Sequence, residues 1–320
     1  MFFKTLMIWM IMISILISLS SNFWFIFWTM LEVNLMAFLP IMNNKNVSNC
    51  NSMITYFVIQ SFSSSLFFMS SIMWMIEELN LFLIISNISM MIKLGMIPFH
   101  FWIISVSETL EMNCLLILLT LQKMIPLFIL TKMVSSIILM ISIMSSIFGS
   151  LMAMSFKMIR KILIFSSISH LGWITILIYI KSSFWIIYIM IYSLILFKLF
   201  KVLKKNNISL IMNFFLKKTM TYEKIMLASS MMSLSGMPPF LGFFMKLISI
   251  LIIIKFSLLI TMILIISSLI NTYFYMRILS PIFFLSKNLI KTFNVSKMMK
   301  IMFFNLNLIL LSMIMTFMMC

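Results

Sequence analysis

Long runs of apolar residues, separated by short polar stretches, dominate the sequence. In LMIWMIMISILISL, residues 6–19, the apolar positions are nearly continuous and do not alternate with polar ones. A membrane-spanning helix needs about 20 mostly apolar residues, and within lipid only helices and closed barrels satisfy their own backbone polar groups. Because barrel strands would alternate apolar and polar positions, the pattern predicts an all-α polytopic membrane protein.

Turn residues, charges and run lengths predict about eleven transmembrane helices. The predicted spans cover residues 3–20, 23–42, 53–75, 80–104, 112–131, 133–155, 161–180, 184–203, 223–251, 256–280 and 301–319. Short loops on one side of a membrane protein collect lysine and arginine. With the N-terminus on that side, seventeen of the 23 lysines and arginines fall there. This asymmetry supports the number of spans, because a missed or added helix would scramble it.

Composition points to a gene from an organelle. The chain is 63% hydrophobic and 9% charged, so a single soluble domain could not cover its surface with polar groups. Its favoured residues, including 39 methionines, mostly have A/T-rich codons, which is typical of a mitochondrial genome, with an AT-rich bacterium as the alternative. The N-terminus enters a span directly and has no Arg-rich leader, as expected of a protein made inside the organelle. We expect the N-terminus and the basic loops on the matrix side.

The net charge and the cysteines indicate no further chemistry. The charge of +17 comes from loops that set the orientation and meet anionic lipid head groups, for which cardiolipin is a candidate, and implies no nucleic-acid partner. Cys50, Cys114 and Cys320 are odd in number and far apart, which indicates neither a disulfide framework nor a metal site. Two histidines, with no aspartate in the chain, make no convincing set of metal ligands.

Four charged residues lie deep within the predicted spans, where each costs about 3 kcal/mol or more. They are Glu32, Lys93, Lys123 and Lys246. We expect Glu32 either to pair with Lys93, which would lower the desolvation cost of both, or to be a protonated carboxyl bound to a neighbouring helix. Lys123 lies about ten residues from either end of its run, so it is too deep to reach the interface easily and is suited to taking and releasing a proton.

Two similar segments interrupt the apolar runs. KLGMIPFHFW, residues 93–102, and SLSGMPPFLGFFMK, residues 233–246, share the phrase GM-x-PF and place a lysine nearby. Proline and glycine break helices, and the residues expected to do so are Gly95, Pro98, Gly236, Pro238 and Pro239. Broken spans free backbone groups that bind ions or water, which is the usual place of the binding site in transporters.

The spacing of the two breaks predicts two copies of one unit. Each break falls in the fourth span of a five-span group, so residues 1–132 and 133–280 would form two repeats, with broken helices near 93–99 and 236–246. Because five is odd, the second repeat would be inverted in the membrane. Residues 281–320 would supply a loop and a C-terminal transmembrane helix.

The histidines have two interpretations. His100, at the first break, and His170 could relay protons or bind across a helix interface. Nothing in the sequence is similar to a nucleotide-binding loop, a haem attachment sequence or an iron–sulfur cysteine pattern. Energy for ion movement must therefore come from a partner protein or from another ion gradient.

The motifs together resemble those of a known family. They are FWFIFWTMLEVNLMAFLPIM, TYFVIQS, MIKLGMIPFHFW, LLTLQKMIP, IRKILIFSSISHLGW, LSGMPPFLGFFMK and NTYFYMRI. This set resembles the NADH–ubiquinone oxidoreductase chain 2 family in its animal form, the antiporter-like, proton-pumping subunits of respiratory complex I. The lysine at position 246 favours this family over the sister subunits, which usually have glutamate there. Leu247, where a bulkier residue is usual, and the very basic loop 198–224 depart from the family pattern.

The resemblance implies a function and roles for residues. Glu32 and Lys93 would form the Glu–Lys pair of a first half-channel, Lys123 the central lysine, and Lys246 the lysine of the second broken helix. The chain would belong to the H⁺-translocating NADH:ubiquinone reductase of the mitochondrial inner membrane. It would hold no cofactor itself, because NADH, FMN, iron–sulfur clusters and ubiquinone would bind other subunits. Its partners would be the neighbouring antiporter-like subunits and small membrane subunits of the membrane arm.

Two alternatives remain open on the sequence. An autonomous prokaryotic cation/proton antiporter subunit would exchange ions in liposomes without NADH. A membrane scaffold that only holds neighbouring pumping subunits in register would tolerate neutralisation of all four buried charges.

Overall fold

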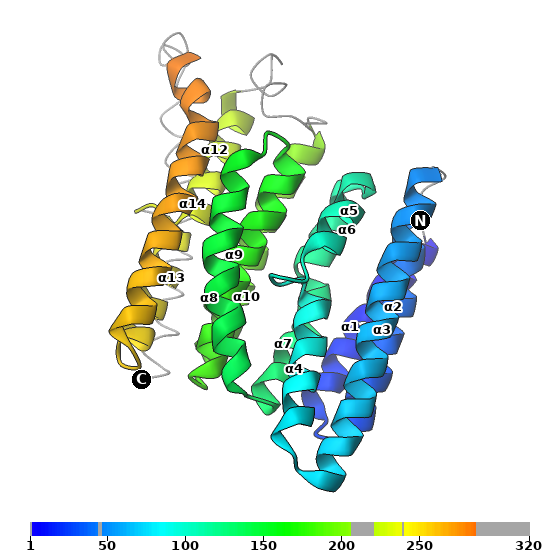
Figure 1. Ribbon diagram of the computed structural model, residues 1–320. Helices are drawn as coiled ribbons and strands as arrows, with labels where there is room; N and C mark the ends of the chain where they lie inside the picture. Colours follow the sequence, from blue (N-terminus) through cyan, green and yellow to red (C-terminus); the bar gives the residue numbers. More distant parts are fainter. Residues whose placement is uncertain (1, 44–46, 206–220, 239, 286–320) are drawn as a thin grey trace. The chain divides into compact units, whose positions relative to one another are not determined.

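The computed structural model describes residues 2–43, 47–205, 221–238 and 240–285, and these form a set of helices (Figure 1). The first helices are α1 (Phe2–Ser20), α2 (Trp24–Met42), α3 (Val47–Glu77), α4 (Asn80–Leu94), α5 (Phe101–Thr109), α6 (Met112–Leu119) and α7 (Met124–Lys132). The later helices are α8 (Ser136–Ser155), α9 (Ile159–Tyr179), α10 (Phe184–Lys205), α12 (Thr221–Ser235), α13 (Leu241–Ile254) and α14 (Leu258–Leu285). The all-α prediction is confirmed.

Within the described ranges, eight helical segments are long and apolar enough to cross a membrane. The predicted spans 80–104 and 223–251 are not single helices, because each is divided into two shorter ones at a break. The span predicted over 301–319 and most of the basic loop lie outside the described residues. The total of eleven spans therefore stays a prediction.

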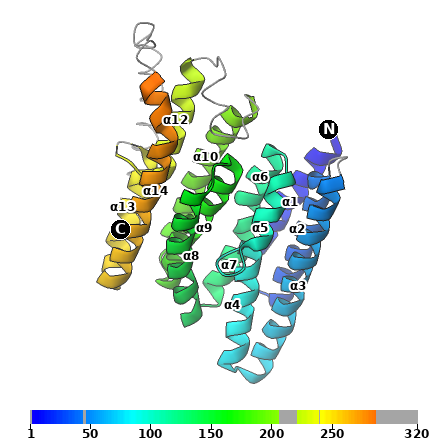
Figure 2. The ribbon, with the colours of Figure 1, turned by 45° about the horizontal axis from the view of Figure 1, so that its top comes forward.

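The chain divides into two compact units. The first comprises residues 1–156 and 160–185, and the second comprises 157–159 and 186–320. In the first unit, α1 packs on α2, α2 on α3, and α3 on both α4 and α5, while α4 also contacts α7 (Figures 1 and 2). These units are defined by packing, whereas the predicted repeats are defined by the order of the spans. The division into units therefore does not test whether the repeats exist.

Small residues let α8 and α9 approach closely within the first unit. A Cβ atom on Gly172 would lie 2.7 Å from the carbonyl oxygen of Ser142, and one on Gly149 would lie 3.0 Å from the amide nitrogen of Ser169. Serine side chains on the same faces bind carbonyls of their own helix, as Ser145 and Ser146 do. Close approach of backbones at small residues is how transmembrane helices gain packing energy without a hydrophobic driving force.

In the second unit, α12, α13 and α14 contact one another. The crossing of α12 and α13 has no room for a side chain at Gly242, where a Cβ atom would lie 1.5 Å from the carbonyl oxygen of Ser233. Lys205 at the end of α10 pairs with Glu223 in the first turn of α12 at 2.5 Å. Together these contacts hold the segments on either side of the second break.

Candidate functional site

The first break follows a glycine in the left-handed region. Gly95 has φ 65° and ψ 39°, and it ends α4 by donating its N–H to the carbonyl of Ile92 at 3.1 Å. The N–H of Met96 donates to the carbonyl of Met91 at 3.2 Å, which completes a common helix-ending motif. Pro98 follows a cis peptide bond, and the next helix, α5, begins only at Phe101.

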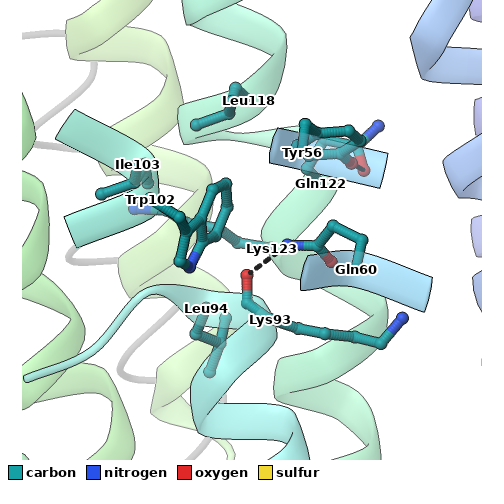
Figure 3. Close-up of a pocket in the computed structure, with 9 residues that line it drawn as sticks. All are labelled: Tyr56, Gln60, Lys93, Leu94, Trp102, Ile103, Leu118, Gln122 and Lys123. Carbon is teal, nitrogen blue, oxygen red and sulfur yellow. Dashed lines mark hydrogen bonds between the residues drawn. The ribbon is translucent and has the colours of Figure 1, made fainter. Parts of the chain in front are cut away.

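Side chains from other positions satisfy the carbonyls that this break frees. The indole N–H of Trp102 donates to the carbonyl of Ile92 at 3.0 Å, and Gln60 Nε2 donates to the carbonyl of Lys93 at 3.5 Å (Figure 3). A buried carbonyl without a partner would be costly, particularly in a membrane. The interruption is thus built into the fold, and it leaves the Lys93 side chain buried, with 8% of its surface exposed.

Glu32 contacts a serine and not a lysine. Its carboxylate accepts a short hydrogen bond from the hydroxyl of Ser64 on α3. Glu32 and Lys93 do not form an ion pair in this structure. Glu32 is thus bound to a neighbouring helix, while the two expectations for it, pairing with Lys93 and a protonated carboxyl, stay predictions.

Lys123 lies at an interruption that the sequence analysis did not predict. The span over 112–131 was expected to be one helix, but α6 ends at Leu119 and a 3₁₀ turn, Leu121–Lys123, precedes α7. The physical reason is Pro126, which has no N–H to bond to the carbonyl of Gln122 and whose ring crowds that carbonyl. Proline is accepted in the first turn of a new helix, so α7 starts just before it.

The ammonium group of Lys123 is buried without a hydrogen-bond partner among the described residues. Only 4% of the surface of this residue is exposed. A small cavity beside it has room for about one water molecule. The cavity is lined by Tyr56, Gln60, Lys93, Leu94, Trp102, Ile103, Leu118, Gln122 and Lys123 (Figure 3). The cavity therefore brings together two of the predicted site residues, Lys93 and Lys123.

The second break, in the second unit, repeats the features of the first. Gly236 has φ 84°, and its N–H donates to the carbonyl of Ser233, while the N–H of Met237 donates to that of Met232. Lys246 on α13 points back to this break and donates from Nζ to the carbonyl of Ser235 at 2.6 Å. Pro238 lies two residues after Gly236, whereas Pro239 lies outside the described residues. Lys246 is buried, with 4% of its surface exposed.

The two histidines stand apart from the cavity in the first unit. His100 Nδ1 lies 3.2 Å from the carbonyl oxygen of Pro98, and its ring packs against Phe101 and faces Phe165 of α9. His170 is buried within α9, with 1% of its surface exposed. Neither histidine is among the described residues that line the cavity. In the described parts of the chain, no three His, Cys, Asp or Glu residues gather as a metal site would require.

Sequence reasoning missed several polar residues of the site. Tyr56, Gln60 and Ser64 follow one another at intervals of four along α3, and Gln122 precedes Lys123. Gln122 joins three elements, since its Oε1 accepts from the Tyr56 hydroxyl at 3.2 Å and its Nε2 donates to Asn34 Oδ1 at 3.0 Å. Four-residue spacing of polar residues within an apolar run was the signal that could have indicated them.

The fold and its buried charges define a class of polytopic membrane proteins in which lysines lie beside interrupted helices. A family model described as "NADH:quinone oxidoreductase/Mrp antiporter, TM" matches residues 21–271. The NADH-ubiquinone oxidoreductase chain 2 of Rhipicephalus sanguineus is 52% identical over 290 residues, which cover 90% of this chain and 93% of that one. The chain belongs to the NADH-ubiquinone oxidoreductase chain 2 family. The family resemblance stated from the sequence motifs is confirmed.

Solved structures share the fold at low sequence identity. A chain of the respiratory complex I from Thermus thermophilus is similar with a TM-score of 0.79 and 17% identity, over 86% of this chain and 69% of that one. A chain of the Mrp complex from Dietzia sp. is similar with a TM-score of 0.77 and 16% identity, and the match spans 85% of this chain and 59% of that one. At such identities the likeness shows a common fold, which agrees with the antiporter-like architecture expected from the motifs.

Proposed function

We propose that this chain is a core membrane-arm subunit of respiratory complex I that moves protons across the mitochondrial inner membrane. Electron transfer from NADH to ubiquinone, carried out on cofactors in other subunits, supplies the energy. Membership of the chain 2 family supports this assignment. The observation that carries the proton-moving role is Lys123, whose buried ammonium has no partner among the described residues and borders a cavity shared with Lys93.

The proposed mechanism uses the charged residues inside the spans. A change at Glu32 and Lys93 alters the electrostatic environment of Lys123, because charges interact strongly where water is scarce. Lys123 then takes up or releases a proton and passes it toward Lys246 of the second unit. His100 and His170 are candidate relays between these groups and the aqueous phases.

We further propose that residues 1–132 and 133–280 are inverted repeats. The support is local: Gly95 and Gly236 both have positive φ, and each donates its N–H to a carbonyl three residues earlier. The following residues, Met96 and Met237, each donate to a carbonyl five residues earlier. Two independent breaks with the same hydrogen-bond pattern are expected of duplicated units.

Placement in the membrane follows from the charge of the loops. The N-terminus and the basic loops would face the matrix, and the neighbouring subunits of the membrane arm and inner-membrane lipids would cover the apolar helix surfaces. Cofactors would be bound by the other subunits. Anionic lipids, cardiolipin among them, would meet the basic loops.

Replacing Lys123 tests the proposed function. In the complex assembled with this chain, Lys123→Met should lower the rate of proton translocation by about 100-fold or more, since a proton carrier of the path is removed. The measurement is the rate of proton translocation into sealed vesicles during NADH oxidation, together with the number of protons moved per NADH oxidised. Lys132→Met is the matched control, because Lys132 lies in the same segment but is exposed at the end of α7 and contacts Asn22 and Phe128.

Three outcomes would contradict the proposal in different ways. An assembled Lys123→Met complex with an unchanged proton-to-electron ratio would exclude the lysine relay. Normal pumping after neutralisation of Glu32, Lys93, Lys123 and Lys246 together would favour a scaffold. Ion exchange by the isolated chain in liposomes without NADH would favour an autonomous antiporter.

A further inference from the structure

Three polar side chains in one row on α3 reach the segments that hold Glu32, Lys93 and Lys123. They are Tyr56, Gln60 and Ser64, called here the α3 stripe. Residues four apart lie above one another on a helix, so the stripe follows a single face for two turns. Each of its members donates one hydrogen bond to a different segment of the site.

Ser64, the last member of the α3 stripe in the sequence, contacts Glu32. The Ser64 hydroxyl donates to the Glu32 carboxylate. One helical turn earlier, Gln60 Nε2 donates to the carbonyl of Lys93 at 3.5 Å, at the place where α4 breaks (Figure 3). The Glu32 carboxylate and the break after Lys93 are therefore both hydrogen-bonded to α3, although Glu32 and Lys93 form no ion pair.

Tyr56, the first member of the α3 stripe in the sequence, contacts the 3₁₀ turn that contains Lys123. The Tyr56 hydroxyl donates to Gln122 Oε1 at 3.2 Å, and Gln122 Nε2 donates to Asn34 on α2 at 3.0 Å. The oxygen and the nitrogen of the Gln122 amide are thus both hydrogen-bonded, so this amide has one orientation. Gln122 precedes Lys123 in the 3₁₀ turn, and Asn34 follows Glu32 by two residues on α2.

The stripe is enclosed, so its bonds are not exchanged freely with water. The exposed fractions of Tyr56, Gln60 and Ser64 are 2%, 6% and 0%. The Tyr56 ring also packs on Phe38 of α2 and on Trp102 of α5. Losing one partner of a buried hydrogen bond leaves the other unsatisfied, which is more costly than losing an exposed bond.

We propose that the α3 stripe is a positioning element that sets Glu32, the Lys93 break and the Lys123 turn relative to one another. It makes the three charged segments respond together, because a shift of α3 along its axis moves all three of its hydrogen-bond partners or breaks their bonds. The stripe itself carries no proton in this inference, which rests on the proposed proton-moving function. The α3 stripe adds to that function a set of residues through which a structural change at one charged residue affects the next charged residue.

Single hydroxyl deletions in the assembled complex test the stripe. Ser64→Ala removes the hydroxyl that donates to Glu32 and also to the carbonyl of Ser61 on its own helix, and Tyr56→Phe removes the hydrogen bond to Gln122. Both variants keep the packing, and each should lower the translocation rate about fivefold. The matched control is Ser63→Ala, because Ser63 is equally buried, at 0%, but donates only to the carbonyl of Gln60 on its own helix. This control should stay within about twofold of the unchanged chain. Ser64→Ala and Ser63→Ala with the same effect would overturn the proposal.

A pair of variants separates positioning from a general loss of stability. Tyr56→Phe and Gln122→Met act on the same hydrogen bond, so the double variant should be no slower than the slower single one. When Ser63→Ala is combined with Gln122→Met, the effects of the two substitutions on the translocation rate should multiply, since these residues share no hydrogen bond. Multiplied effects in the first pair would contradict the shared contact. Co-purification of the variant chain with the complex verifies that each complex has assembled.

The Lys123→Met variant, measured in parallel, distinguishes a failure of the proposed lysine relay from a failure of the proposed role of the α3 stripe. If Lys123→Met pumps normally, the lysine relay of the proposed function is wrong. If Lys123→Met stops pumping while Ser64→Ala and Tyr56→Phe behave like Ser63→Ala, only the role of the stripe is wrong.

Discussion

At residue 236 a glycine leaves room for a lysine side chain. A Cβ atom on Gly236 would lie 2.8 Å from Cδ and 3.0 Å from Nζ of Lys246, and the backbone there has φ 84°. At Gly95, which has a similar φ of 65°, a Cβ atom would meet only Trp102 and Ile103 at ordinary distances. The two glycines therefore share a backbone requirement, but only Gly236 also makes space for a buried charge.

This difference predicts unequal effects of the same substitution. Gly95→Ala and Gly236→Ala should each destabilise the complex by about 1–2 kcal/mol, because a side chain is unfavourable in the left-handed region. Gly236→Ala should also displace Lys246 from the carbonyl of Ser235 and lower translocation further. The measurement compares pumping rate with the midpoint of heat inactivation for both variants. Equal pumping rates at equal stability would show that space for Lys246 is not the reason for Gly236.

At the residue scale, the sequence identified charges more readily than their partners. Glu32, Lys93, Lys123 and Lys246 could be predicted because a charge within lipid is rare and costly. Ser64 and Gln60 could not, since serine is frequent in the spans and usually bonds to a carbonyl of its own helix, as Ser63 does. Which serine faces a carboxylate depends on how α2 and α3 are rotated.

At the scale of elements, close packing of α8 on α9 depends on single atoms. Gly172→Ala would place a Cβ atom 2.7 Å from the Ser142 carbonyl and 2.9 Å from Ser146 Cβ, so the helices would have to separate. We expect a loss of about 1–3 kcal/mol, seen as a lower temperature of heat inactivation. Ser155→Ala, at the exposed end of α8, should leave that temperature unchanged. An unaltered temperature in Gly172→Ala would mean that the helices part without cost.

The elements themselves were predicted well where apolar runs and helix-breaking residues agree. The ends of α1, α2, α8, α9 and α10 lie close to the predicted ends, because apolar length decides them. The interruption at Leu121–Lys123 was not predicted, although Pro126 is three residues beyond it. A proline can either kink a helix or start a new one, and packing around Gln122 decides between these outcomes.

At the scale of the whole molecule, the length of α3 allows a test of orientation. Its 31 residues extend about 46 Å, so its two ends lie on opposite sides of a bilayer core of about 30 Å. Cys50 near its beginning is exposed, and Cys114 is buried. The orientation proposed from the charge asymmetry would put the beginning of α3 on the matrix side.

We therefore predict that an impermeant maleimide labels Cys50 only in permeabilised mitoplasts, in a chain carrying Cys320→Ser. Glu77→Cys in a Cys50→Ser background should be labelled in intact mitoplasts, because Glu77 ends α3 on the other side. Gel shift of the labelled chain is the measurement. Labelling of Cys50 from outside intact mitoplasts would reverse the proposed orientation.

The membrane class, most span positions, the two glycine breaks and the four charges within the spans could be predicted from the sequence. These features depend on local quantities, namely the free energy of moving each residue into lipid and the backbone preferences of glycine and proline. The packing of the folded chain was needed to show that Glu32 meets Ser64, that Gln122 joins Tyr56 to Asn34, and that Lys246 turns back to Ser235. Those contacts join residues far apart in the chain, and helix packing alone sets which faces meet.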